Sequence, residues 1–124
     1  MKREILFRGK RVDNGEWVYG VPYERNGEVQ MIRSKPVSVV PESICEYTGL
    51  IDENGVKIFE GDIVNCKSTG YFFFGYVVDW YAKCARWVIR KQCPFSMSED
   101  FKYEIIGNIY DNPEWLEMQE ETNG

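Results

Sequence analysis

The stretch RVDNGEWVYGVPYERNGEVQMIR, residues 11–33, decides the fold class, because two Asn-Gly pairs in it separate segments that alternate apolar and polar residues. Asn and Gly both tolerate the positive φ that the tight turns of β-hairpins require. A third pair follows at Asn54-Gly55. These hairpin signals predict antiparallel β structure, with strands at about 4–10, 16–24 and 28–33.

The second half of the chain continues the pattern of short strands. A glycine turn enters a strand at 61–64, the stretch 71–81 is dense in aromatic residues, and the stretches 86–91 and 101–110 alternate in polarity. The sequence Asn-Pro-Glu at 112–114 combines an N-cap with proline at the first helical position, and it predicts a short C-terminal helix. We therefore expect an all-β fold, mainly antiparallel, forming a small barrel or sandwich with an SH3-like element in the C-terminal half.

The length of 124 residues and the absence of any linker or repeat predict a single domain over residues 1–124. Within it we expect N-terminal hairpins at 1–41, a connection at 42–61, barrel-like strands at 62–110 and an acidic terminal helix or tail at 111–124.

The chain has a formal net charge of −5 and no histidine. The absence of histidine excludes Ser-His and Cys-His enzymes and removes the commonest zinc ligand. Acids and bases balance over residues 1–110, and the five acids of residues 111–124 supply the whole excess charge. The sign of the net charge therefore does not argue against a nucleic-acid partner for the body of the protein.

The cysteines predict no cofactor or metal site. They are widely spaced and form no CxxC pair: Cys45, Cys66, Cys84 and Cys93. The chain shows neither a secretory signal nor an apolar stretch of bilayer length. We expect reduced thiols, a location in the cytoplasm and no membrane partner.

One candidate contact site is a run of four aromatic residues, Tyr71, Phe72, Phe73 and Phe74. Because successive side chains of a strand point to opposite faces, at least one of these rings must point away from the core. Either another segment of the chain or a second copy covers it, so self-association through this run is one interpretation.

A second candidate is a basic and aromatic stretch, for which we select Lys83, Arg86, Trp87, Arg90 and Lys91. Rings that stack on bases and cations that contact phosphates are typical of single-stranded nucleic-acid sites. The alternative is that the rings fill the core while the cations face solvent. A second cationic cluster comprises Lys2, Arg3, Arg8, Lys10 and Arg11.

Four acids in eleven positions, Asp52, Glu53, Glu60 and Asp62, have the hard oxygen ligands that a divalent metal needs. Acids at hairpin tips also serve turn chemistry, and no calcium-loop pattern is present, so we assign no metal ligand here. Glycines at 49, 55 and 61 are expected to occupy turn positions with positive φ.

The stretch YTGLIDENGVKIFEGDIV, residues 47–64, resembles the signature of the YopX family of phage and prophage proteins. The stretches 3–9 and 104–114 resemble the two ends of that family. The departures are Ile51, where a basic residue is common, and Phe59 in place of tyrosine. The resemblance implies a mostly β protein of phage or prophage origin that acts in the bacterial cytoplasm, with a homo-oligomer as one expectation. It supplies no catalytic or ligand-binding residue.

These observations favour a non-enzymatic accessory protein, a binding or regulatory module that contacts a host or phage macromolecule. The alternative is a nucleic-acid-binding β-barrel that uses residues 80–91. A carboxylate or metal-dependent hydrolase is the remote alternative, and it would need at least two of Asp52, Glu60, Asp62 and Asp79 to meet in one pocket.

Overall fold

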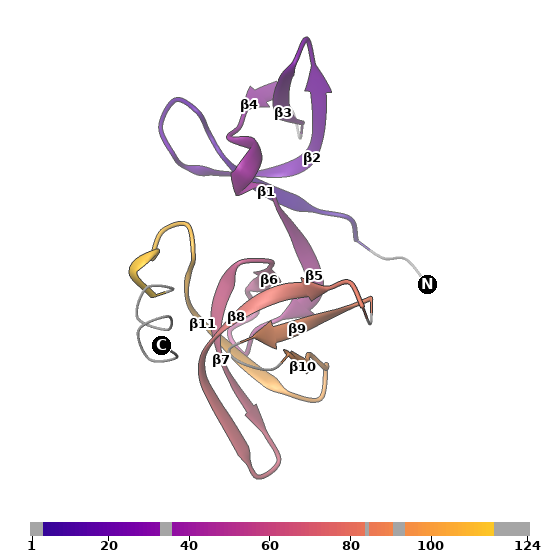
Figure 1. The fold of residues 1–124 in the computed structure, drawn as a ribbon, viewed down its shortest axis with the longest axis vertical. Helices are drawn as coiled ribbons and strands as arrows, with labels where there is room; N and C mark the ends of the chain where they lie inside the picture. Colours follow the sequence, from indigo (N-terminus) through magenta and orange to yellow (C-terminus); the bar gives the residue numbers. More distant parts are fainter. Residues whose placement is uncertain (1–3, 33–35, 84, 91–93, 116–124) are drawn as a thin grey trace. The chain divides into compact units, whose positions relative to one another are not determined.

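The computed structural model describes residues 4–32, 36–83, 85–90 and 94–115 (Figure 1). Antiparallel strands in two sheets make up most of these residues and helix is almost absent, which confirms the all-β prediction. No helix in the described residues is long and apolar enough to cross a membrane. The expected C-terminal helix falls mostly on residues 116–124, outside the described part of the chain.

The chain forms two compact units, Met1–Gly49 and Leu50–Gly124. Each is described by itself below, and the single domain over 1–124 stays a prediction. The boundary falls inside one strand, so its first residues belong to the first unit and its last residues to the second.

The first unit is a sheet of antiparallel strands in the order β4-β3-β2-β1-β5. Its elements are β1 (Phe7–Lys10), β2 (Trp17–Arg25), β3 (Glu28–Ile32), β4 (Pro36–Ser38), the 3-10 helix η1 (Pro41–Ser43) and β5 (Cys45–Ile51). Asn26 and Gly27 join β2 to β3 with φ values of 53° and 78°, as the Asn-Gly prediction requires.

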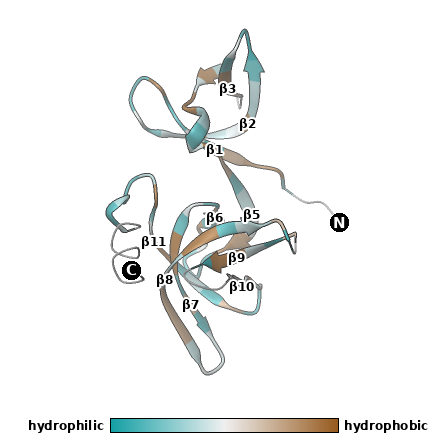
Figure 2. Cartoon of the chain, in the orientation of Figure 1, coloured by the Kyte–Doolittle hydropathy of each residue, from teal (hydrophilic) through white to brown (hydrophobic). Residues whose placement is uncertain are grey.

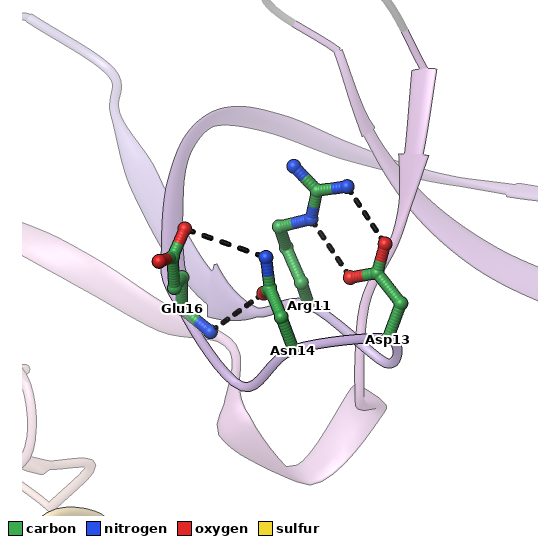
Figure 3. A network of polar contacts seen from close by, with 4 residues as sticks. All are labelled: Arg11, Asp13, Asn14 and Glu16. Atoms are coloured by element: carbon green, nitrogen blue, oxygen red, sulfur yellow. Dashed lines mark hydrogen bonds and ion pairs between the residues drawn. The ribbon is translucent and has the colours of Figure 1, made fainter.

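The turn between β1 and β2 is held by its own polar side chains (Figure 3). Arg11 donates to Asp13 from Nε and from one terminal nitrogen, at 2.9 and 2.8 Å. The Asn14 side-chain oxygen accepts from the backbone N–H of Glu16 at 2.9 Å. The hydrogen bonds between Arg11 and Asp13 raise the pKa of the guanidinium and lower the pKa of the carboxyl group.

The second unit contains a five-stranded sheet in the order β10-β9-β8-β7-β11. Its elements are β6 (Lys57–Phe59), which lies beside the end of β5, then β7 (Asp62–Ser68), β8 (Tyr71–Tyr81), β9 (Arg86–Arg90), β10 (Pro94–Ser96) and β11 (Lys102–Asn108). Within the five-stranded sheet, β7 comes first in the sequence and β11 comes last, and these two strands pair antiparallel with each other. The SH3-like element expected in the C-terminal half stays a prediction.

The core cluster of the second unit gathers residues from β6, β7, β8, β9 and β11, and hydrophobic residues follow β8 and β9 (Figure 2). The buried members are Ile58, Val64, Cys66, Val78, Trp87, Ile89 and Tyr103. The Tyr103 hydroxyl reaches the edge of this core and accepts from the backbone N–H of Ser98 at 2.8 Å. Burial raises the pKa of Tyr103, and burial raises the pKa of the Cys66 thiol to about 11.

A β-bulge bends β8 at Gly75. Val64 pairs with Tyr76 and Cys66 pairs with Phe73, so Phe74 and Gly75 both lie opposite Asn65. The Asn65 side-chain oxygen accepts from the Gly75 N–H at 3.0 Å, and the Trp115 indole N–H donates to the Gly75 carbonyl at 3.0 Å. Gly75 has a φ of 72°, and a Cβ there would lie 2.2 Å from a ring carbon of Trp115. Only glycine fits both the conformation and the contact.

We expect Gly75→Ala to lower the free energy of unfolding by about 2–5 kcal/mol, since it adds overpacking against Trp115 to the cost of a left-handed backbone. Gly70→Ala is the matched control, because Gly70 has a φ of 82° but no heavy atom within 4 Å of its Cβ position. It should cost about 1–2 kcal/mol. Urea denaturation checks both values, and equal losses would contradict the packing of Trp115 on the bulge.

Stability should also fall at alkaline pH. The Cys66 thiol keeps its proton up to a pKa of about 11 in the folded protein, against an ordinary value of 9.0 when exposed. Between these values the unfolded chain loses this proton while the folded chain retains it, so raising the pH favours unfolding. Unfolding measured from pH 8 to 11 should show this loss, and Cys66→Ala should show a smaller one. Identical pH profiles for the two proteins would show that Cys66 is not buried as described.

Candidate functional site

The hairpin of β7 and β8 carries the run of four aromatic rings, and the strand sends them alternately to its two faces. Phe73 packs against the core, and Tyr71 stacks beside it with ring centroids 6.4 Å apart. Phe72 and Phe74 lie on the opposite face, also with centroids 6.4 Å apart. Tyr71, Phe72 and Phe74 are 67%, 57% and 60% exposed. The core therefore accommodates one of the four rings.

Strand register places charged side chains beside the two exposed phenylalanines. Phe72 lies opposite Lys67, and Lys67 lies opposite Lys102, which makes one row across β8, β7 and β11. In the next row Asn65 lies opposite Glu104 and donates a hydrogen bond to it at 3.2 Å. We call this surface the outer face, with the members Asn65, Lys67, Phe72, Phe74, Lys102 and Glu104.

A shallow pocket of about 120 Å³ opens on the outer face. It is lined by Glu53, Asn65, Lys67, Phe72, Lys102, Tyr103 and Glu104. The Lys67 ammonium lies 6.0 Å from the centre of the Phe72 ring. Within the described residues, neither Lys67 nor Lys102 has an acidic partner within ion-pair distance. The pocket thus combines two cations, two acids and the edge of an exposed ring.

The row of aromatic rings on this side of the hairpin continues beyond β8. The Trp115 ring lies 6.3 Å from Phe74, centroid to centroid, and its indole is held by the bulge at Gly75. The three rings of Phe72, Phe74 and Trp115 thus form a strip that runs from the edge of the pocket toward the C-terminal segment.

The structure divides the basic and aromatic stretch between core and surface. Trp87 is buried in the core, where its ring packs edge-on against Trp80 at 5.0 Å. Arg90 pairs with Asp79 at 3.2 Å and its guanidinium lies 5.5 Å from the centre of the Tyr81 ring. The remaining members differ: Lys83 is exposed, Arg86 is exposed and donates to Ser96 at 3.1 Å, and Lys91 lies outside the described residues.

The second cationic cluster belongs to the first unit. Arg8 is buried, and the centre of its guanidinium lies 4.3 Å from the centre of the Trp17 ring, while the Lys10 ammonium lies 4.6 Å from that ring. Arg11 is engaged by Asp13. Lys2 and Arg3 lie outside the described residues. The described cations of this cluster therefore have partners within their own unit.

The acids of the signature stretch hold backbone in place. Asp52 is buried, and one of its oxygens accepts from the N–H groups of Asn54 and Val56, each at 2.9 Å. Its other oxygen accepts from the N–H of Ile105 in β11 at 3.3 Å. Asp62 is buried too and accepts from the Phe59 N–H at 2.8 Å.

These bonds engage two of the four acids that were considered for a hydrolase, Asp52 and Asp62. The described residues contain no group of three or more histidine, cysteine or acidic side chains that could hold a metal ion.

Sequence reasoning selected the rings at 71–74 but missed Lys67, Lys102 and the pocket. Lys67 and Lys102 stand 35 positions apart and meet only through the register of β7 and β11. The contact of Trp115 with Gly75 likewise carries no signal in the sequence.

We expect Asp52→Ala to lower the free energy of unfolding by about 2–4 kcal/mol, because it leaves backbone N–H groups of the turn at 52–56 and of β11 without this acceptor. Glu53→Ala, which changes the exposed neighbour, should stay within about 0.5 kcal/mol of the unaltered protein. Chemical denaturation measures both. If Asp52→Ala were as mild as Glu53→Ala, the carboxylate would not link the turn to β11.

Comparison with known proteins identifies the family of the chain. No curated protein matches it. The family model described as YopX protein matches residues 6–117, which is nearly the whole chain. That range includes the signature stretch with Asp52 and the entire outer face. The chain therefore belongs to the YopX protein family.

Proposed function

We propose that the protein is a non-enzymatic binding module that acts through macromolecular contacts, and that the outer face is its contact surface. The observation that carries this proposal is the exposure of Phe72 and Phe74 on a sheet whose opposite face forms the core. Large rings exposed to solvent lack the favourable free energy that burial of apolar surface provides, and aromatic residues are enriched at protein interfaces. Family membership is consistent with an accessory role of phage or prophage origin in the host cytoplasm.

A second copy of the chain is one macromolecule that this surface fits. Tyr71, Phe72 and Phe74 are exposed on the two sides of one hairpin, with Phe73 between them half buried. Self-association would cover rings that the second unit leaves in water.

The other two functions have weaker support. A nucleic-acid site at residues 80–91 would have to work without Trp87 as a stacking platform, since that ring is in the core. Residues 50–110 also carry 8 acids and 7 bases, without the excess of cations that phosphate contacts require. Of the four acids named for a hydrolase, Asp52 and Asp62 accept backbone hydrogen bonds and Asp79 pairs with Arg90.

Site-specific photo-crosslinking tests the contact surface. The photoreactive residue p-benzoylphenylalanine is introduced at Phe72, at Phe74 or, as the control, at Tyr19, an aromatic residue of the first unit that is 39% exposed. Cells that express each variant are irradiated and the adducts are identified by mass spectrometry. We expect discrete adducts from positions 72 and 74 and none of these from position 19.

The mass of the adduct identifies the partner class. An adduct of twice the mass of the chain would identify a second copy, and a heavier protein or a nucleic acid would identify another partner. The absence of adducts from positions 72 and 74, or the same adducts from position 19, would contradict the proposed contact surface.

A further inference from the structure

Two lysines of the outer face stand in an arrangement that costs stability. Lys67 of β7 and Lys102 of β11 lie directly opposite each other in the sheet. Like charges in this position destabilise a sheet. Both side chains are exposed, and neither has an acidic partner in the described part of the chain. An anionic group bound between them would offset that cost.

The size of the pocket limits what can occupy it. At about 120 Å³ it is well below the roughly 300–1,000 Å³ of pockets that enclose a small ligand. A single side chain fits such a volume, and the aromatic strip beside it offers a surface for the neighbouring residues. Interfaces concentrate their binding energy in anchor side chains of this kind, which fill small pockets on the partner.

The charges around the lysines favour a protein over a nucleic acid as the source of the anion. Glu53 and Glu104 line the same pocket, so a chain of phosphates would meet carboxylates as well as ammonium groups. Residues 50–110 carry 8 acids and 7 bases, so this part of the chain lacks the excess of cations that a polyanion requires. One carboxylate can interact with both lysines, and an otherwise neutral or basic segment around it brings no further negative charge toward Glu53 and Glu104.

We propose that the outer face binds a segment of a partner protein in which an Asp or Glu side chain sits between Lys67 and Lys102. Apolar residues beside that acid pack on Phe72, Phe74 and Trp115. The inference rests on the proposed function and names the chemistry of the partner. Charge-assisted hydrogen bonds from two ammonium groups hold the carboxylate, and ring contacts hold the residues that follow it.

The experiment selects binders from a library of random dodecapeptides with the complete protein as the target. Binding of the selected peptides is measured by fluorescence polarisation, together with a thymidine dodecamer as the nucleic-acid probe. The test variants are Lys67→Glu/Lys102→Glu and the milder Lys67→Gln/Lys102→Gln. The matched control is Lys83→Glu/Arg86→Glu, which makes the same change in net charge elsewhere in the second unit. Circular dichroism verifies that each variant is folded.

We expect the selected peptides to contain an acid next to aromatic or aliphatic residues. Both lysine variants, and replacement of that acid by its amide in the peptide, should each weaken binding at least about tenfold. The control variant should bind as the unaltered protein does.

Three outcomes would overturn the inference. They are a failure to select any binder, selected peptides whose binding is insensitive to Lys67 and Lys102, and oligothymidine binding that is tighter than peptide binding and is lost in the lysine variants.

Failure here is distinguishable from failure of the contact surface. Crosslinks at positions 72 and 74 together with a negative peptide result would leave the contact surface in place and remove only the lysine site. A loss of peptide binding in Phe72→Ser/Phe74→Ser, with no effect of the lysine variants, would also support the contact surface and contradict only the lysine site.

Discussion

A β-strand buries only every second side chain where the core covers just one of its faces, and this constraint governs the start of β8. β8 begins with four aromatic residues, of which Phe73 packs on the core and its two neighbours point to the other face. The register of β7 and β11 then sets Lys67 and Lys102 beside those rings. The same pairing that builds the core thus creates an aromatic and charged surface that the core does not use.

Two local interactions stabilise the strands that form this surface. The bulge at Gly75 lets the half-buried Trp115 ring approach the backbone of β8 and extend the line of rings begun by Phe72 and Phe74. The Asp52 carboxylate ties a tight turn to β11, the strand that carries Lys102 and Glu104. The signature by which the family is identified therefore includes a residue with a structural role, and the candidate contact surface lies elsewhere. This division agrees with a protein that works by binding.

Much of the fold could be predicted, because its signals are local. The Asn-Gly pairs gave the hairpin between β2 and β3, and the glycines at 49, 55 and 61 have φ values of 89°, 81° and 85°. The connection expected at 42–61 contains β5, since Gly49 sits within a strand and does not end it. The site was harder to predict: the exposed rings follow from strand alternation, whereas the lysine pair depends on a register between distant strands. The position of Trp87 could not be predicted either, because sequence alone does not say which face of its strand is buried.

The central claim is that Phe72 and Phe74 lie outside the core of their own chain and are available to a partner. Paramagnetic relaxation enhancement of aromatic ring protons by a soluble gadolinium chelate tests it directly on the monomeric protein in solution. The account predicts strong enhancement for Phe72 and Phe74 and weak enhancement for Tyr103, which is 2% exposed. Protection of Phe72 and Phe74 equal to that of Tyr103 would contradict it.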